Sequence, residues 1–459
     1  PRADRYLSAG EASAPAPERD AEPGQTIALG ESTSPRWWQL FQSPEMDGLL
    51  QQVVGGNLTL QAAGARLAAE RELLVATRAA LYPQLAFTAQ IAREKESSTA
   101  FGLPPSAFAL PPNFTLLQAG PVASYNFDLF GASRSRLEQQ RAVSEFQQFQ
   151  LAATYLTLTG NAAAQAIAVA SVRAQLQAVD DLLRVDQETL ALVRKARDVG
   201  VIPESDVVSA ESQLAVDATL RPPLEQQLDV CRHALAILVG RVPADWSAPD
   251  FDLSRLRLPQ SLPVALPSQL VHQRPDILAA EAQLHAAGAQ VGVATAQLFP
   301  QITLSASISG TSLNGSSLFD PAGLVWSIAA GLTQPLFDAG MRRAQRRAAL
   351  AEFKASASDY QQTVLQAFAQ VADDLQALSH DAWLLSKQKL ALDTAAESVR
   401  LQRARYQIGG SGIIDLLDAQ RQYAQASLGY VRAEAQRYAD TIQLQIAMGG
   451  GTLAVAAPP

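Results

Sequence analysis

Residues 402–420 read QRARYQIGGSGIIDLLDAQ, and residues 193–211 read VRKARDVGVIPESDVVSAE. When one stretch is laid on the other with a shift of 209 positions, Gly200 meets Gly409, and aliphatic residues after each turn also coincide. Each copy is a glycine-marked turn between two segments rich in helix-forming residues. We therefore predict a duplicated helical hairpin, and we expect its second copy to be the functional end of the molecule.

The whole chain has the composition of a folded, acidic protein. It contains 459 residues, of which 48% are hydrophobic and 17% charged, and its formal net charge is −8. Because the chain has no basic stripe, we expect no nucleic-acid partner. The single cysteine, Cys231, cannot form an internal disulfide, and scarce cysteine is compatible with an extracytoplasmic protein. No run of about 18 apolar residues exists, so no transmembrane helix is predicted.

Residues 1–43 are expected to form an extended N-terminal segment. The first residues, up to about position 35, are rich in Pro, Ala, Glu and Ser, a composition that disfavours a packed core. The chain begins at Pro1 and shows no signal peptide. We interpret this start as a mature or trimmed N-terminus from which any targeting segment has been removed.

Residues 44–240 predict a first structural repeat. A period-two alternation of apolar and polar residues, typical of strands, replaces the helical pattern after Pro83 and returns from Val122 to Leu129. A proline-free run then follows, and at 1.5 Å per residue it would form a rod of about 100 Å, which favours a helical array. The expected elements are helices within 44–82, a β-hairpin at 83–130, a long helix at 132–199 and a return helix at 203–239 that is interrupted at Pro222-Pro223.

Residues 271–450 repeat this plan after a proline-rich crossover at 241–270. The run Leu298-Phe299-Pro300-Gln301 aligns with Leu81-Tyr82-Pro83-Gln84, just before each expected hairpin. The second rod contains neither proline nor glycine. The expected elements are a helix at 275–298, a β-hairpin at 300–337, a long helix at 341–408, a return helix at 413–448 and a C-terminal tail at 451–459.

The expected strands each have one apolar and one small, polar face. Four strands cannot close a barrel, and an open strand edge is not viable in lipid, so strands that enter a membrane must come from several chains. Three chains would give twelve strands, a known size for outer-membrane barrels. The strands alone leave a soluble sheet packed on helices as an alternative. Phe130 and Phe337 lead directly into the rods, which indicates a strand barrel stacked on a helical barrel.

At this point the chain resembles the TolC-like outer membrane factors, in particular the lipoprotein branch that serves tripartite efflux pumps. The resemblance covers about residues 36–451. It is carried, in order, by Tyr125-Asn126-Phe127-Asp128-Leu129-Phe130-Gly131, Gln273-Arg274-Pro275-Asp276-Ile277, Leu298-Phe299-Pro300-Gln301, Gln334-Pro335-Leu336-Phe337-Asp338, Arg405-Tyr406 with Gly409, and Leu416-Leu417-Asp418-Ala419-Gln420-Arg421.

The resemblance implies an α+β membrane protein with two internal repeats. Its homotrimer would combine a 12-stranded β-barrel in the outer membrane, four strands from each chain, with a continuous 12-helix α-barrel in the periplasm. The implied function is a passive conduit that exports drugs and other small molecules and is gated at its periplasmic tip. Implied partners are outer membrane lipid, a periplasmic adaptor (membrane fusion) protein and an inner-membrane pump of the resistance-nodulation-division type.

Asp415 and Asp418 are the principal candidates for the constriction. They are three residues apart and therefore lie on one face of a helix. In a trimer they would form two acidic rings, whose like-charge repulsion suggests a functional reason for them. The family places its constriction on these two positions, and we include Leu417 between them. The alternative is a solvated helix start, where acidic residues suit the helix dipole.

A second expectation concerns how the tip is held shut. In the family, a tyrosine and an aspartate near the turns link neighbouring hairpins, so we expect a contact between the Tyr406 hydroxyl and Asp206. The arginine of the best-known relative is matched here by Ser411, and Arg197, Arg403 or Arg405 could replace it. The expected adaptor-contact residues at the hairpin tips are Gly200, Val201, Gly409, Gly410 and Ser411.

The sequence contains no recognisable motif for catalysis or for binding a metal or cofactor. No catalytic triad, phosphate loop or metal-ligand spacing of the four histidines is present, so we expect no enzyme activity, no metal and no cofactor. The family's lipoproteins begin with an acylated cysteine, which this chain lacks. Two alternatives to small-molecule efflux stay open: an exit duct for type I protein secretion, and a soluble coiled-coil scaffold or adaptor.

Overall fold

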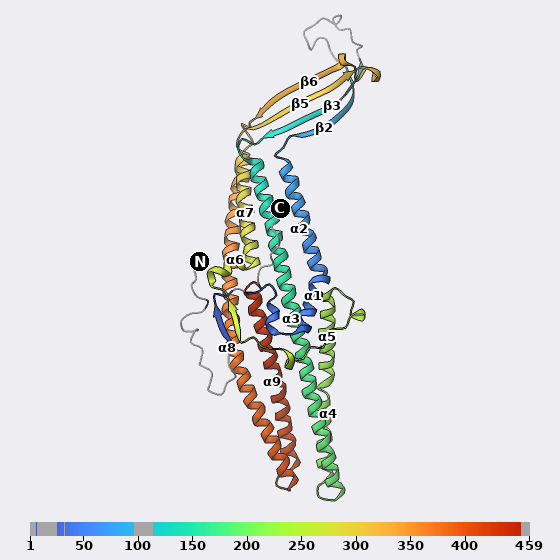
Figure 1. Ribbon diagram of the computed structural model, residues 1–459, viewed down its shortest axis with the longest axis vertical. Helices are drawn as coiled ribbons and strands as arrows, with labels where there is room; N and C mark the ends of the chain where they lie inside the picture. The colour runs from blue at the N-terminus through green and yellow to red at the C-terminus, as the bar shows by residue number, and fades with distance from the viewer. Residues whose placement is uncertain (1–5, 7–24, 32, 96–112, 451–459) are drawn as a thin grey trace. The chain divides into compact units, whose positions relative to one another are not determined.

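The computed structural model, shown in Figure 1, describes residue 6 and residues 25–31, 33–95 and 113–450. Its residues group into two compact units. The first comprises the chain up to Arg66, Gln147–Ala279 and the chain from Tyr360 onward, and the second comprises Leu67–Phe146 and Ala280–Asp359. Each half of the chain has the same order of elements: α2, β2, β3, α3 and α4 in the first, and α7, β5, β6, α8 and α9 in the second.

The second unit contains an antiparallel sheet of four strands in the order β2-β3-β5-β6. The strands are β2 (Gln84–Glu94), β3 (Phe114–Phe127), β5 (Gln301–Ser312) and β6 (Leu324–Thr333). Two short 3-10 turns, Gly315–Ser317 and Pro321–Gly323, connect β5 to β6. Since the two hairpins of the chain join through β3 and β5, β2 and β6 are left as the edges.

The register of the sheet sorts its side chains into an apolar and a polar face. One continuous row of paired residues is Leu85, Ala123, Ala306 and Ile328. Leu85 and Ile328, at the two edges, are 76% and 78% exposed in the single chain. On the opposite face the Ser307 and Ser327 hydroxyls lie 2.8 Å apart. The sheet therefore presents a broad exposed apolar surface on one side and hydroxyl groups on the other.

Four helices contribute residues to both units. They are α2 (Leu58–Ala79), α3 (Ala132–Asp198), α7 (Pro275–Ala296) and α8 (Met341–Gln407). Helices α3 and α8 have 67 residues each, in agreement with their proline-free, alanine-rich sequences. Within the second unit, the Gln140 side-chain amide of α3 donates a hydrogen bond to Glu70 of α2 at 2.7 Å.

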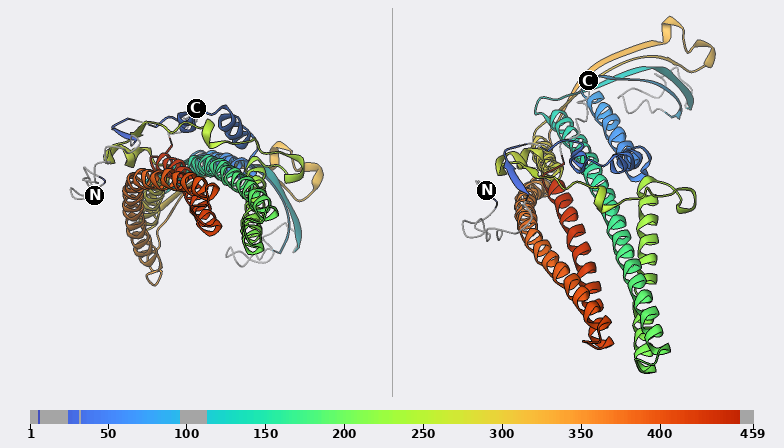
Figure 2. Two further views of the ribbon diagram at one scale, coloured as in Figure 1. Left: turned by 90° about the horizontal axis from the view of Figure 1, so that it is seen from below. Right: turned by 60° about the horizontal axis from the view of Figure 1, so that its bottom comes forward.

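The first unit contains two helical hairpins, which lie side by side in Figures 1 and 2. One is formed by α3 and α4 (Glu204–Ala218), the other by α8 and α9 (Ile413–Ala447). The return of the first hairpin, in which an interruption at Pro222-Pro223 was expected, consists of two helices: α4 ends at Ala218, and α5 (Arg221–Val239) begins with prolines in its first turn. Proline suits that position because its missing N–H needs no partner there.

The main core of the first unit is built around tryptophan and phenylalanine side chains near the start of the described chain. Trp37 and Phe41, in the 3-10 helix Trp37–Phe41, are fully buried. They belong to one apolar cluster with Leu49 of α1 (Pro44–Gly56), Ala163 of α3 and Leu235 of α5. The small residues of α3 let neighbouring backbones approach closely. At Gly160 a Cβ would lie 2.2 Å from the Cδ1 of Ile446 in α9.

Two stretches to which the sequence assigned no helix or strand contain regular elements. Strand β1 (Thr26–Leu29) lies within the N-terminal segment 1–43 and pairs in parallel with β4 (Ser261–Val264) of the crossover 241–270. The crossover also contains 3-10 turns at Pro243–Asp245 and Leu253–Arg255 and the start of α6 (Pro267–Gln273). The expectation of an extended N-terminal segment is therefore incomplete: it holds a paired strand and, at Trp37–Phe41, a 3-10 helix.

None of the helices in the described ranges is both long enough and apolar enough to cross a membrane. The expected C-terminal tail, 451–459, lies outside the described residues.

Candidate functional site

The two glycine turns have the same backbone hydrogen bonds. In the first, Gly200 N donates to Arg197 O at 2.8 Å and Val201 N donates to Ala196 O at 3.0 Å. In the second, Gly409 N donates to Tyr406 O at 3.1 Å, and Gly410 N donates to Arg405 O at 2.8 Å.

This pair of bonds closes the end of a helix around a residue with left-handed φ, a conformation that glycine adopts without a Cβ clash. Gly200 has φ +75° and Gly409 has φ +76°, so both turns require glycine for the same reason.

An apolar cluster joins the two hairpins just behind their turns. Its buried members come from three helices: Leu190 and Val193 of α3, Val207 and Ala210 of α4, and Ile413 and Leu416 of α9. Leu417 and Tyr406 pack against it. Residues far apart in sequence therefore share one small core at this end of the first unit, which holds the polar residues nearby in defined positions.

Asp415 and Asp418 line one hollow, as their spacing predicts. The hollow, with a volume of about 800 Å³, is lined by residues of α4, α8 and α9, including Val208, Leu417 and both aspartates. Asp415 also accepts a hydrogen bond from Gly412 N at 3.3 Å, so it stabilises the start of α9 as well. Asp415 therefore does two things at once: it stabilises the start of α9, and it lines the hollow.

Asp418 makes its contacts within α9. It forms an ion pair with Arg421 and accepts a hydrogen bond from the Gln422 side-chain amide at 2.8 Å. These partners reduce its free charge, but the side chain of Asp418 is still 43% exposed.

The expected contact between the Tyr406 hydroxyl and Asp206 does not take the form of a hydrogen bond. The Tyr406 hydroxyl is buried and has no hydrogen-bond partner among the described residues. Asp206 lies close enough to act electrostatically: burial first, and then the negative charge of Asp206, raise the pKa of the Tyr406 phenol. The structure thus places the two residues near one another without the bond, and the Asp206 carboxylate accepts instead from the neighbouring Ser205 hydroxyl at 3.4 Å.

Of the three candidate arginines, Arg403 is the one that crosses between hairpins in the described structure. It lies on α8 and donates to Glu188 of α3 at 3.2 Å. Arg197 binds Glu204 in its own hairpin, and Arg405 donates to the Gly410 carbonyl of its own turn.

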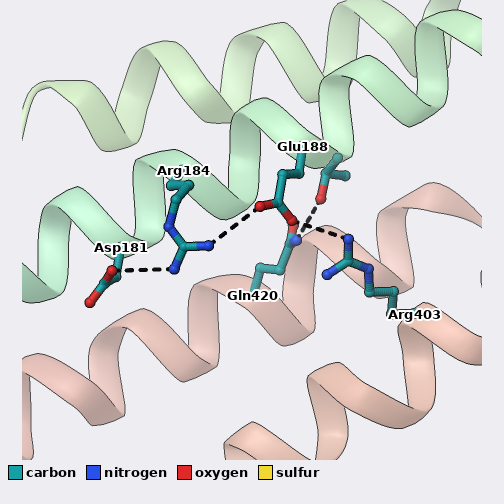
Figure 3. A network of polar contacts seen from close by, with 6 residues as sticks. Asp181, Arg184, Glu188, Arg403 and Gln420 are labelled. Atoms are coloured by element: carbon teal, nitrogen blue, oxygen red, sulfur yellow. Dashed lines mark hydrogen bonds and ion pairs between the residues drawn. The ribbon is translucent and has the colours of Figure 1, made fainter.

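Figure 3 shows a continuous polar chain around this crossing. Arg184 of α3 contacts both Asp181 and Glu188, and Glu188 in turn accepts from Arg403. Beside it, the Gln420 amide of α9 donates to the Thr189 hydroxyl of α3 at 2.8 Å, in a buried position. No local pattern in the sequence marks Glu188 or Thr189, because their partners are on another hairpin.

The comparisons with known proteins agree with this architecture. A family model described as outer membrane efflux protein matches residues 49–241 and 266–450. The chain belongs to the outer membrane efflux protein family. Among the curated relatives of this efflux protein is the pyoverdine export outer membrane protein OpmQ of Pseudomonas aeruginosa, which is 31% identical over 420 residues, covering 91% of this chain and 87% of the relative. The cation efflux system protein CusC of Escherichia coli is 29% identical over 427 residues, covering 90% and 88%.

Solved structures of outer-membrane channels are also similar to the efflux protein. The outer-membrane channel OprN matches with a TM-score of 0.87 and 28% identity, covering 98% of this chain and 97% of that one. A CusC structure matches with a TM-score of 0.81 and 25% identity, covering 94% and 100%. The efflux protein is therefore a channel component of an outer-membrane efflux system, and the resemblance read from its sequence motifs is confirmed.

Within the described ranges, no three His, Cys, Asp or Glu side chains are grouped as metal ligands. The polar contacts of the candidate site between helices are ion pairs and hydrogen bonds, as between Arg403 and Glu188 and between Gln420 and Thr189. Such contacts can hold two hairpins together or release them.

Proposed function

We propose that this efflux protein is a passive homotrimeric conduit for drugs and other small molecules, gated at the tips of its helical hairpins. The observation that carries the proposal is the four-stranded sheet with one apolar face, one hydroxyl-bearing face and two unpaired edges. Three such sheets, joined at their edges, would form a closed twelve-stranded barrel. In such a barrel every backbone N–H and C=O group of the strands has a hydrogen-bond partner, which is necessary in lipid because no water is present there. The apolar face then contacts lipid and the hydroxyl face lines water.

The proposed constriction consists of Asp415, Leu417 and Asp418, repeated in each of the three copies. The shared hollow of these residues and the location of Asp418 near the start of α9 support this assignment. Acidic rings would favour cations and slow anions at the narrowest point. Tyr406 and Asp206, which lie behind the constriction, belong to the contacts that change when the hairpins separate.

Energy and selectivity would come from partners. The proposed partners are a periplasmic adaptor that contacts the turns around Gly200, Val201, Gly409, Gly410 and Ser411, and an inner-membrane pump of the resistance-nodulation-division type. Relatives are named for pyoverdine, toluene and cation export, which supports small molecules as cargo. A lipid anchor on an N-terminal cysteine outside this chain would add to the attachment in the outer membrane.

The function is tested by two linked measurements on the full protein. In detergent, the purified protein is expected to run as a trimer and to give stepwise single-channel currents in planar bilayers. A strain lacking the gene is expected to become more sensitive to drugs, with its secreted proteins unchanged. Recovery in the soluble periplasmic fraction would contradict the conduit, and loss of a secreted protein without any change in drug sensitivity would indicate type I secretion instead.

A further inference from the structure

A pair of buried carboxyl groups links the two helices of the first hairpin. Asp186 of α3 is 3% exposed and Asp217 of α4 is 7% exposed. Neither oxygen of Asp186 receives a hydrogen bond from any described residue. The polar group that faces Asp186 is the carboxyl of Asp217, which itself accepts from the Gln213 side-chain amide at 2.8 Å.

Two ionised carboxylates in this arrangement would be unstable. Both are acceptors, so neither can satisfy the other, and their negative charges repel strongly in a buried site. A single proton removes both problems, because the protonated carboxyl becomes a donor to its partner. Burial first, and then the adjacent Asp217 carboxyl, which favours the protonated form as a hydrogen-bond acceptor and as a negative charge, raise the pKa of Asp186 to about 7.

No described cation neutralises the pair. On α3, Arg184 binds Asp181 and Glu188, and on α5, Arg221 binds Asp180 and Glu225.

The other helices near this level supply no free cation either. On α8, Arg403 is paired with Glu188, and on α9, Arg421 is paired with Asp418. The polar group that α9 directs at α3 near this level is the neutral amide of Gln420, which is bound to Thr189.

The second hairpin contains a similar pair at another level. Asp381 of α8, which is 8% exposed, faces Asp440 of α9. Burial and Asp440 raise the pKa of Asp381 to about 7, while Arg437 acts in the opposite direction. The repeat shift of 209 carries Asp186 onto Ala395, so the two pairs are not copies of one ancestral feature. Each hairpin therefore contains its own carboxyl pair between its long helix and its return helix.

We propose that Asp186 and Asp217 share one proton and act as a proton-dependent brace between α3 and α4, which loosens as the pH of the surrounding compartment rises. The brace lies on the hairpin that also carries Asp206 and Val207 behind the turn. An effect of the brace on gating rests on the proposed function. The brace itself does not, because it is a property of the hairpin alone.

The direction of the pH dependence follows from the raised pKa. The folded hairpin holds the shared proton up to a pH of about 7, whereas an exposed aspartate loses its proton near its ordinary pKa of 3.8. The stabilisation is therefore complete below the lower value and is lost as the pH rises through the higher one.

Hydrogen–deuterium exchange of the detergent-solubilised protein tests the brace. After correction for the intrinsic pH dependence of exchange, we expect amides flanking Asp186 and Asp217 to be protected about tenfold less at pH 8.5 than at pH 5.5. Asp186→Asn and Asp217→Asn keep a hydrogen-bond donor without a charge, so each should abolish this pH dependence. Asp229→Asn, at an exposed position of α5, is the matched control and should leave it unchanged.

A second readout protects the test against variants that fold poorly. Infrared spectra at pH 5.5 should contain the carbonyl stretch of protonated, buried carboxylic acids, and the part of this band that is missing from Asp186→Asn should disappear from the wild-type spectrum at pH 8.5. Equal protection at the two pH values, or a pH dependence that survives in both Asn variants, would overturn the proposal. If the hairpin behaves as expected but conductance does not follow it, the brace stands and its link to the gate fails.

Discussion

At the scale of single residues, the contact most open to test is the ion pair between Arg403 and Glu188. Both side chains are more than two-fifths exposed, so the pair contributes at most about 1 kcal/mol to stability. A contribution of that size cannot hold the fold together. It can shift an equilibrium between closed and separated hairpins by up to about fivefold.

We therefore predict that Arg403→Ala raises the open probability of single channels by up to about fivefold, with little change in thermal stability. The control is Arg400→Ala, since Arg400 pairs with Glu397 on its own helix. Exchanging the charges, with Arg403→Glu and Glu188→Arg together, should restore wild-type behaviour. An equal effect of the control variant would show that the ion pair between Arg403 and Glu188 does not hold the hairpins closed.

The candidate site was partly visible in the sequence, for a physical reason. Asp415 and Asp418 could be placed on one face because helical periodicity is local, and both line the same hollow. The contact between the Tyr406 hydroxyl and Asp206 was implied by the family resemblance, and the structure places the two residues near each other without a hydrogen bond. Arg403 and Glu188 are 215 positions apart, so their contact depends on how whole hairpins pack.

At the scale of elements, α3 and α9 pack closely because Gly160 lacks a side chain. An added Cβ would lie 2.2 Å from Ile446 Cδ1 and 2.7 Å from its Cγ1. We predict that Gly160→Ala destabilises the protein by about 1–3 kcal/mol, because the side chain of Ile446 must move within a packed core. Gly64→Ala in α2, where nothing lies within 4 Å, should instead be neutral or stabilising by up to about 1 kcal/mol.

Chemical denaturation of the detergent-solubilised protein measures both changes. Equal destabilisation by the two substitutions would mean that glycine flexibility, rather than the approach of α3 to α9, explains the effect.

The elements themselves differ in how well the sequence predicts them. Helices α3 and α8 follow from long runs without proline, because nothing local interrupts their hydrogen bonds. Strand β1 has four residues with no alternation, and its partner β4 lies more than 200 positions away, so no local pattern reveals it. The break between α4 and α5 was expected at Pro222-Pro223 and falls just before them, since the prolines begin the new helix rather than interrupt an old one.

At the scale of the whole molecule, the unpaired edges of the sheet require partners in lipid. Two strands separate β2 from β6 within one chain, which places them roughly 14 Å apart at about 4.8 Å per strand. Disulfide formation needs Cα atoms within about 7 Å, so cysteines on these two edges cannot join within one chain. Any disulfide between the edges must therefore link two copies.

We predict a result for Gln90→Cys on β2, combined in turn with Ser327→Cys or Ala329→Cys on β6. When intact outer membranes are oxidised, non-reducing gels should show a ladder of disulfide-linked dimers and trimers that ends at the trimer. A closed ring of three copies stops there because it has no free edge left, whereas an open assembly would continue to larger species. The control pairs Ser124→Cys with Ser305→Cys, which face each other within one chain and should give an internal disulfide and no ladder. Linked species beyond the trimer would exclude a closed barrel of three chains. If a scan of all β6 positions against Gln90→Cys gave no link, these edges would not meet.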